Sequence, residues 1–129
     1  MKYFKGSLAV PQTNKSYFES VNETASFLEK KSYKIYASYD CHPQNHISFA
    51  SQHKGNHSFD TKIIRGESYT LWPDHCIDGS PGSFIKLNDS IAYEKVKKGF
   101  HEQHESYSVF SDDKIREEKF SVKLKKKRL

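Results

Sequence analysis

A helical pattern that leads directly into a strand pattern constrains the fold of this chain more than any other feature. Asn14 is a favourable helix N-cap, and Lys30 and Lys31 suit the negative end of a helix dipole. Between them, apolar side chains recur at helical spacing, at Tyr17 or Phe18, Val21, Ala25 and Leu28. Residues 33–38 then offer aromatic and β-branched side chains, which predict a β-strand. A helix followed by a strand is typical of α/β proteins with a parallel sheet.

The remaining segments are predicted from their turn residues and alternation. Residues 1–13 are expected to be extended and to end in a turn at Pro11, and residues 43–81 to be mainly loop. Residues 92–97 alternate in polarity and predict a second strand, with Lys98 and Gly99 at its carboxyl end. Residues 111–129 are highly charged, which predicts either a helix or disorder.

Composition limits the classes of protein to consider. A chain of 129 residues suits one domain, and its net charge of +5 comes from the last seven residues. The positive side chains there are Lys123, Lys125, Lys126, Lys127 and Arg128. The rest of the chain is neutral, so the charge belongs to a solvated tail, and a nucleic-acid binder acting through that tail is an alternative. No apolar run approaches the roughly 20 residues that span a bilayer, and no signal peptide is evident, which favours a cytoplasmic protein.

Two cysteines, Cys41 and Cys76, do not make a disulfide framework. Each lies directly beside a histidine, Cys41 beside His42 and Cys76 beside His75. Both are predicted to be small buried thiols next to a site that these histidines could form. A redox pair or a pair of thiolate metal ligands remains open.

One carboxylate and three imidazoles lie in segments rich in turn residues. Asp40 and His42 point to the same side of an extended backbone, where successive side chains alternate. His46 follows after Pro43, which can turn it back toward the same point, and His75 comes from a separate loop. Carboxylate and imidazole ligands suit divalent Zn, Fe or Mn better than Ca or Mg. Because open α/β sheets bind ligands at the carboxyl ends of their strands, Asp40 and His42 are well placed for such a site.

Spacing alone does not single out these four residues. The chain has 7 histidines, so close pairs arise by chance. His53 with His57, and His101 with His104, have spacing that is equally suggestive. A metal site at Asp40, His42, His46 and His75 is therefore one interpretation of several.

Two longer motifs make this interpretation specific. The first is a strand that ends in Asp-x-His-Pro-x-Asn-His-x-Ser-Phe-Ala, formed here by Asp40, His42, Pro43, Asn45, His46, Ser48, Phe49 and Ala50. The second, Leu71 to Gly82, has the pattern Leu-Trp-Pro-x-His-Cys-x-x-Gly-Thr-Pro-Gly with Ser80 in place of threonine. With the opening Gly6 to Pro11, these motifs resemble the nicotinamidases of the isochorismatase-like hydrolase superfamily. The resemblance runs from about Gly6 to Phe110, and divides the chain into a partial hydrolase domain, 1–110, and a charged tail, 111–129.

The resemblance implies a Rossmann-like parallel sheet and the hydrolysis of nicotinamide to nicotinic acid and ammonia, in NAD salvage. It implies that Asp40, His42 and His75 bind the metal, with His46 as a fourth ligand in some members. Trp72 would form a wall of the nicotinamide pocket, Tyr107 would lie near it, and Lys98 would be the catalytic lysine. Without the resemblance, Trp72 reads as a core or lid residue and Lys98 as a solvated lysine.

Two parts of the family's catalytic machinery have no counterpart in this sequence. Members of the family use a cysteine thiolate that lies well past the lysine, and an aspartate in an Asp-x-Gln-Asn-Asp-Phe segment before the first matched motif. Neither motif occurs here, so we expect a partial sheet and no amidase activity from this chain by itself. The alternatives are a metal-binding or partner-docking remnant, which could form a homo-oligomer or join a complementing chain.

Overall fold

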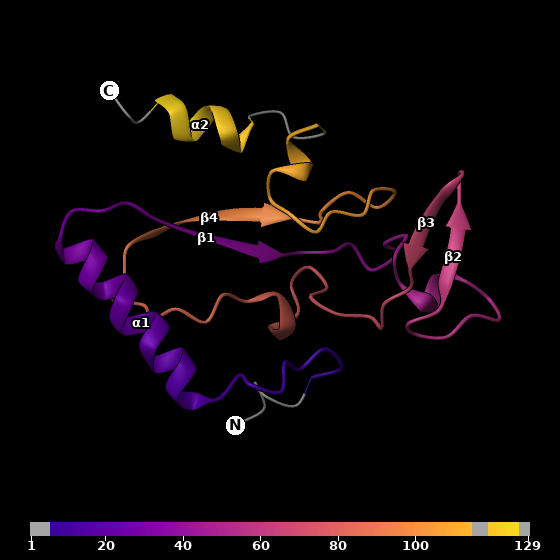
Figure 1. Ribbon diagram of the computed structural model, residues 1–129, viewed down its shortest axis with the longest axis horizontal. Coiled ribbons are helices and arrows are strands. Elements are labelled where there is room, and N and C mark those ends of the chain that lie inside the picture. Colours follow the sequence, from indigo (N-terminus) through magenta and orange to yellow (C-terminus); the bar gives the residue numbers. More distant parts are fainter. Residues whose placement is uncertain (1–5, 115–118, 127–129) are drawn as a thin grey trace. The chain divides into compact units, whose positions relative to one another are not determined.

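The computed structural model describes residues 6–114 and 119–126, and its first regular element is a helix (Figure 1). Helix α1, Lys15–Lys30, starts at Asn14, whose side chain accepts a hydrogen bond of 2.9 Å from the backbone N–H of Tyr17. This confirms the predicted helix and its cap. Before the helix, the described residues form two turns, closed by Ala9 to Gly6 and by Thr13 to Val10. The turn around Pro11 was predicted, whereas the extended backbone predicted ahead of it is wrong for residues 6–9. Residues 1–5 lie outside the described residues.

Two strands form a parallel pair that carries the α/β character of the chain. Strand β1, Ile35–Asp40, lies beside β4, Tyr93–Lys98, and both arrows point the same way in Figure 1. Both strands were predicted, but each ends later than expected. Asp40 and Lys98 are therefore the last residues of their strands, at the carboxyl edge where parallel sheets bind ligands.

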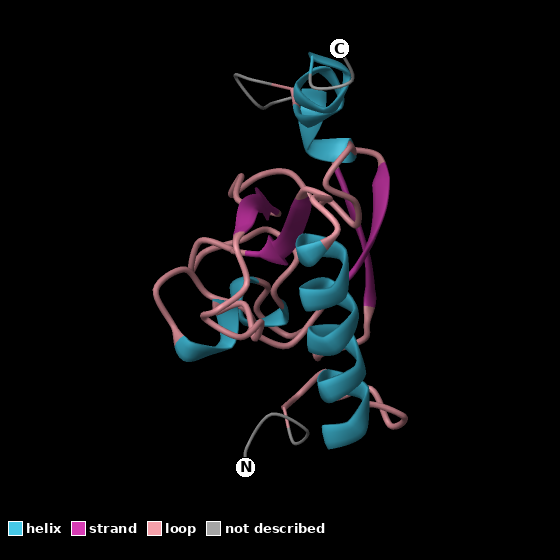
Figure 2. Ribbon diagram, turned by 90° about the vertical axis from the view of Figure 1, so that its left-hand side faces the viewer, coloured by secondary structure: helices cyan, strands magenta, loops and turns pink. Residues whose placement is uncertain are grey.

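A β-hairpin lies within the segment predicted to be mainly loop. Strands β2, Thr61–Ile64, and β3, Glu67–Thr70, pair in antiparallel fashion from Thr61 opposite Thr70 to Ile64 opposite Glu67. Arg65 and Gly66 turn the chain with φ of 53° and 84°, the positive pair that a tight hairpin turn needs. The prediction of loop was wrong here. Elsewhere in that segment loops dominate, interrupted by one-turn 3-10 helices at Ala50–Gln52 and Pro81–Ser83. Figure 2 shows that loops make up much of the described chain.

The chain divides into two compact units. One is formed by residues up to Ala37 together with Ile85–Lys95, and the other by Ser38–Phe84 together with residues from Val96 onward. The second unit contains most of the buried side chains of the described residues, including Phe49 and Leu71, which are fully buried. Its interior is also unusually polar, with His42, His46, Ser48, Ser83, Ser106 and Asp112 among the buried residues.

The C-terminal part of the described chain is helical. It contains a 3-10 helix, Ser111–Lys114, and helix α2, Phe120–Lys126, so the helical alternative for 111–129 holds where the structure describes it. Phe120 is buried and its ring packs 5.5 Å from that of Phe110. Residues 115–118 and 127–129 lie outside the described residues, and with them two of the five positive tail residues. Among the described residues, no helix is both long and apolar enough to cross a bilayer.

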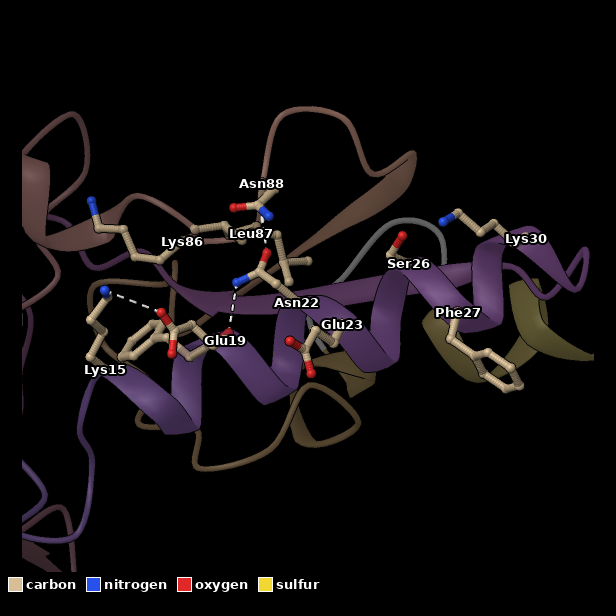
Figure 3. Close-up of a pocket in the computed structure, with 12 residues that line it drawn as sticks. Lys15, Glu19, Asn22, Glu23, Ser26, Phe27, Lys30, Lys86, Leu87 and Asn88 are labelled. Carbon is tan, nitrogen blue, oxygen red and sulfur yellow. Dashed lines mark hydrogen bonds and ion pairs between the residues drawn. The ribbon is translucent and has the colours of Figure 1, made fainter.

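A groove of about 780 Å³ lies in the first unit, between α1 and residues 85–88 (Figure 3). Its lining mixes apolar side chains such as Phe18 and Leu87 with charged ones such as Lys15 and Glu19, which form an ion pair of 3.3 Å. Asn22 crosses the groove and accepts a hydrogen bond of 2.7 Å from the backbone of Asn88. The lining residues form no group of possible metal ligands; among the described residues, such a group lies in the second unit.

Candidate metal centre

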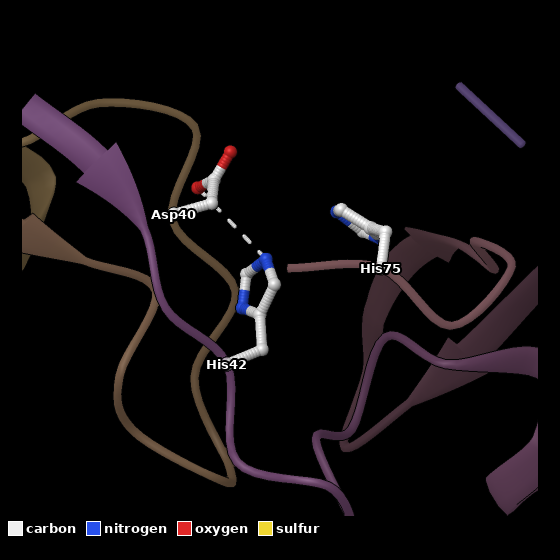
Figure 4. Close-up of side chains that lie close together, drawn as sticks. All are labelled: Asp40, His42 and His75. Carbon is white, nitrogen blue, oxygen red and sulfur yellow. Dashed lines mark ion pairs between the residues drawn. The ribbon is translucent and has the colours of Figure 1, made fainter. Parts of the chain in front are cut away.

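Asp40, His42 and His75 come together in the second unit, as the sequence predicts. One ligand atom from each lies within 4.8 Å of the others, and Figure 4 shows the three side chains converging. Asp40 ends β1, His42 follows two residues later, and a backbone hydrogen bond of 2.9 Å from His42 to Cys76 holds the His75 loop alongside. Among residues 6–114 and 119–126, this is the one group of three or more such ligands.

Both histidines of the group use Nδ1 for a hydrogen bond and leave Nε2 as the possible metal ligand. Nδ1 of His42 donates to the carbonyl oxygen of Gly99 at 2.7 Å, and Nδ1 of His75 donates to that of Pro73 at 2.8 Å. A carbonyl oxygen can only accept, so each Nδ1 must carry the proton and each Nε2 must carry a lone pair. Metal-binding histidines are oriented in this way, with one nitrogen held by a backbone carbonyl. The hydrogen bonds therefore leave two Nε2 atoms ready to bind a cation beside the Asp40 carboxylate.

Gly99 holds His42 in place through its backbone carbonyl, and its lack of a side chain leaves room for the His42 ring. A Cβ at position 99 would lie 2.4 Å from Cε1 of the His42 ring, closer than real contacts allow. The backbone there has φ of 63°, in the left-handed region that favours glycine. Its N–H donates to the buried carboxylate of Asp112 at 2.9 Å, so the peptide that accepts from His42 is itself anchored. The sequence places Gly99 after Lys98 but gives no signal of its contact with His42.

Lys98 forms an ion pair with Asp40 and donates to the backbone oxygen of Ser106 at 3.5 Å. Its side chain is only 19% exposed, so it is not the solvated lysine that the sequence allows as an alternative. Because Lys98 and Nε2 of His42 both face the same carboxylate oxygen, a cation at this site would share Asp40 with an ammonium group. The lysine therefore lies beside the metal group, in contact with the Asp40 carboxylate.

His46 is close to the group but is engaged elsewhere. Its ring lies 4.5 Å from that of His42, centre to centre, and it is completely buried. Its Nε2 donates to the backbone oxygen of His104 at 3.1 Å, and its Nδ1 accepts from the Ser48 hydroxyl at 2.8 Å. Both ring nitrogens are thus hydrogen-bonded, and the structure does not bring His46 into the ligand group. Its role as a fourth ligand stays a prediction.

The two buried imidazoles are held in the neutral form that metal binding requires. Burial lowers the pKa of His42, and the nearby His75 lowers it further. Burial also lowers the pKa of His46, and His42 adds to that effect. A protonated imidazole has no lone pair to offer a metal, so this environment keeps ligand atoms available at lower pH than in an exposed histidine.

Cys41 and Cys76 lie near the metal group, but their surroundings do not activate either thiol as a nucleophile. Cys41 is 2% exposed, as predicted, whereas Cys76 is partly exposed. Burial raises the pKa of both thiols, with the Asp78 side chain adding to the effect on Cys41 and the Asp40 charge adding to that on Cys76. Since the thiolate is the reactive form, both cysteines are held as thiols.

Trp72 and Tyr107, the predicted pocket residues, contact each other in the same unit. The indole Nε1 of Trp72 donates to the Tyr107 hydroxyl at 3.3 Å, and the ring centres are 6.4 Å apart. The backbone N–H of Trp72 donates to Ser48 at 2.7 Å, which joins it to the segment that carries Phe49. The Phe49 ring in turn packs 5.5 Å from the ring of His42. The sequence did not single out Phe59, whose ring lies 6.0 Å from that of Trp72.

The other histidine pairs form no comparable group within the described residues. His53 uses its Nε2 to donate to the backbone of Ile47 at 2.7 Å. His57 is exposed and its nearest carboxylate, Asp60, is 3.8 Å away. His101 accepts a hydrogen bond from its neighbour Gln103, and neither it nor His104 joins a metal-ligating cluster. The structure thus favours the site at Asp40, His42 and His75 over the pairs with equally suggestive spacing.

Comparison with known proteins points to one family. The chain is 34% identical to the nicotinamidase of Escherichia coli over 112 residues, which are 84% of this chain and 51% of that protein. Among solved structures, a nicotinamidase/pyrazinamidase of Acinetobacter baumanii superposes with a TM-score of 0.70 at 36% identity. It is matched over 81% of this chain and 49% of its own. The chain is a nicotinamidase homologue.

A second structure bears on the metal group. The pyrazinamidase of Pyrococcus horikoshii, solved in complex with zinc, superposes with a TM-score of 0.62 at 29% identity, over 85% of this chain and 54% of its own. The fold is therefore that of the isochorismatase-like nicotinamidases, with a parallel sheet as predicted. The matches cover between 37% and 55% of the length of the curated nicotinamidases. No protein-family profile matches it.

Proposed function

We propose that this chain supplies the metal-binding and ring-binding part of a nicotinamidase, which hydrolyses nicotinamide to nicotinic acid and ammonia in NAD salvage. The observation that carries the proposal is the convergence of Asp40, His42 and His75, with both Nε2 atoms left free by hydrogen bonds at Nδ1. The same three residues belong to the motifs by which the sequence resembles the nicotinamidases, and the matched proteins are named for their action on nicotinamide and pyrazinamide.

The ligand set suits a divalent transition metal. One carboxylate and two imidazoles fit Zn, Fe or Mn and leave coordination positions for water or substrate. A metal bound there would orient water and lower its pKa. Zinc is the first ion to test, because the Pyrococcus horikoshii relative was solved with it. His46 supports the set through its contact with His42, and it would have to release its hydrogen bond to Ser48 to become a fourth ligand.

The aromatic side chains supply a surface for the ring of the substrate. Trp72 and Tyr107 present large faces beside the segment that carries the metal group, and an aromatic face stacks favourably on a pyridine ring. A neutral amide with an attached ring, nicotinamide or a similar small amide, fits a surface that combines these rings with a cation. We propose Trp72 and Tyr107 as substrate-contacting residues on this basis.

Lys98 is the residue of this chain that we propose to act in catalysis. Its ammonium lies at the metal group, paired with Asp40, where it can stabilise negative charge that develops on a reacting amide. The sequence has no counterpart of the family's nucleophilic cysteine or its aspartate base, and both thiols of this chain are kept protonated. We propose that the chain by itself binds nicotinamide and does not hydrolyse it.

The proposal is tested by measuring binding and hydrolysis on the same protein. The purified chain, loaded with zinc, is titrated with nicotinamide by calorimetry, and ammonia release is followed in parallel, with His75→Ala as the matched control. We expect saturable binding by the wild-type chain and no ammonia beyond the level of His75→Ala. Steady ammonia release that His75→Ala abolishes would contradict the proposed lack of activity. Absence of nicotinamide binding would contradict the proposed substrate.

The apolar face of α1 favours a second candidate function, docking onto another chain. Tyr17 and Phe27 are 57% and 59% exposed, and Ala25 is the one buried residue of this helix. A second copy or a complementing chain could cover these side chains. Light scattering of the wild-type chain and of Tyr17→Ser, across a range of protein concentrations, tests self-association. If both proteins have the mass of a monomer at every concentration, self-association is excluded.

A further inference from the structure

Phe59 combines a strained backbone with an exposed aromatic ring. Its φ is 75°, a value that bulky side chains rarely adopt, and its side chain is 60% exposed. A phenylalanine that stabilised the fold by packing in the core would be buried. Glycine or asparagine would adopt this backbone conformation with less strain than phenylalanine.

The backbone around Phe59 is fixed, so the strained conformation is built into the fold. The N–H of Phe59 donates to the carbonyl of Leu71 at 2.6 Å, and the N–H of Leu71 donates back to Asp60 at 2.8 Å. The Asp60 carboxylate accepts from the N–H of His57 at 2.7 Å and closes the turn. Leu71 is completely buried and directly precedes Trp72, so these bonds set the Phe59 ring beside the indole.

Phe59, Trp72 and Tyr107 form one aromatic cluster. The Phe59 and Tyr107 rings stand nearly perpendicular to the indole, at 88° and 78°, with centres 6.0 Å and 6.4 Å away. Phe59 and Tyr107 are 60% and 67% exposed, so much of their surface is open to a ligand. Exposed aromatic rings that lie together in one cluster, unlike single exposed apolar side chains, are a feature of binding sites.

The cluster is tied to the metal group by short backbone bonds. Trp72 donates to Ser48 at 2.7 Å and accepts from Ala50 at 2.9 Å, so it brackets Phe49. The Phe49 ring lies 5.5 Å from the rings of both His42 and His75. An aromatic amide whose carbonyl approached the cation site would thus have its ring on the side of the segment where the cluster lies.

We infer that Phe59 contacts the heteroaromatic ring of the substrate and, with Trp72 and Tyr107, sets the preference for aromatic over aliphatic amides. The inference rests on the proposed function and deepens it. The strained, exposed ring of Phe59 is explained by ligand contact, because neither burial nor the turn requires a phenylalanine at this position.

Trp72 gives a direct readout, since the chain contains one tryptophan. Saturable quenching of its fluorescence by nicotinamide measures binding in the wild-type chain, Phe59→Gly and Phe59→Leu. Glycine adopts the φ of position 59 without strain, so Phe59→Gly stays folded while it removes the ring. Phe27→Leu is the matched control, because Phe27 is an equally exposed phenylalanine, at 59%, and belongs to the other unit.

We expect Phe59→Gly and Phe59→Leu to bind nicotinamide about threefold to tenfold more weakly, in line with the loss of one aromatic contact. Phe27→Leu keeps the wild-type affinity, and calorimetric binding of acetamide, which has no ring, is the same in all four proteins. Wild-type affinity in Phe59→Gly would overturn the inference and leave the proposed function intact. No saturable binding of nicotinamide to the wild-type chain would overturn both.

Discussion

The metal group and helix α1 differ in how many of their side chains have partners within the chain. Around the metal group, His42, His75 and His46 all have their ring nitrogens oriented by hydrogen bonds within the chain. Helix α1 buries only Ala25 and leaves apolar side chains such as Phe27 in solvent. The comparison shows that the side chains of the metal group can be held in place by contacts within one unit. The helix, by contrast, gains little from packing, so local signals must define it.

The largest effect is expected from Gly99→Ala. The added methyl group would overlap the His42 ring, and alanine disfavours the φ of 63° at this position. Zinc affinity, measured by calorimetry, should fall at least about 100-fold, since outer contacts to a metal-binding histidine alone are worth 10- to 100-fold. Gly66→Ala is the control, because φ is 84° there but no atom lies within 4 Å of the added Cβ. Equal zinc affinity in the two variants would mean that Gly99 does not position His42.

A smaller effect of opposite sign is expected from Lys98→Met. The Lys98 ammonium holds the Asp40 carboxylate and repels an incoming cation, so its removal should raise zinc affinity about threefold to tenfold. Lys97→Met serves as control, because Lys97 pairs instead with Asp78, at 2.8 Å. Unchanged or weaker zinc binding in Lys98→Met would show that the lysine assists the metal rather than competing with it.

The same group should make the unfolding free energy depend on pH. Burial lowers the pKa of His42 and His46 in the folded chain, while in the unfolded chain both titrate near the ordinary value of about 6.5. Unfolding therefore takes up protons as the pH falls below about 6.5, and stability that is fully present above it is lost toward pH 5. Urea unfolding of the metal-free chain from pH 8 to 5 measures this loss.

The control compares a buried with an exposed histidine. His46→Gln should flatten the pH dependence, whereas His57→Gln should not, because the His57 side chain is 89% exposed. Equal slopes in both variants would place the titrating group elsewhere.

The smallest effect is expected in the helix. Asn14→Ala removes the side-chain hydrogen bond to the N–H of Tyr17, which should lower the free energy of unfolding by about 1 kcal/mol. Phe27→Ser should change it by less than about 0.5 kcal/mol, because exposed substitutions rarely matter more. Urea denaturation followed by circular dichroism measures both. A larger loss in Phe27→Ser than in Asn14→Ala would reveal that the apolar face of α1 is covered in solution.

Sequence reasoning succeeded where the signal is local. The cap at Asn14 and the helix it begins follow from side-chain chemistry within a few residues, and so do the strands that end at Asp40 and Lys98. The hairpin at Arg65 and Gly66 was missed, because its two-residue turn begins with arginine rather than the usual asparagine or aspartate.

The candidate site shows a similar division. Asp40, His42 and His75 were predicted as ligands from motifs, and the structure brings them together. The support from Gly99 joins residues 57 positions apart, and no local pattern reports such a contact. The strained conformation of Phe59 likewise becomes visible only from the backbone, because it depends on pairing with Leu71.

The most direct test of the metal centre is a zinc titration of the purified, metal-free chain by calorimetry, with His75→Ala and His57→Ala beside it. The convergence of Asp40, His42 and His75 predicts one zinc ion per wild-type chain. Affinity should fall at least about 100-fold in His75→Ala and remain unchanged in His57→Ala. Zinc binding that is equally tight in His75→Ala, or equally weakened in His57→Ala, would contradict a metal centre at these three residues.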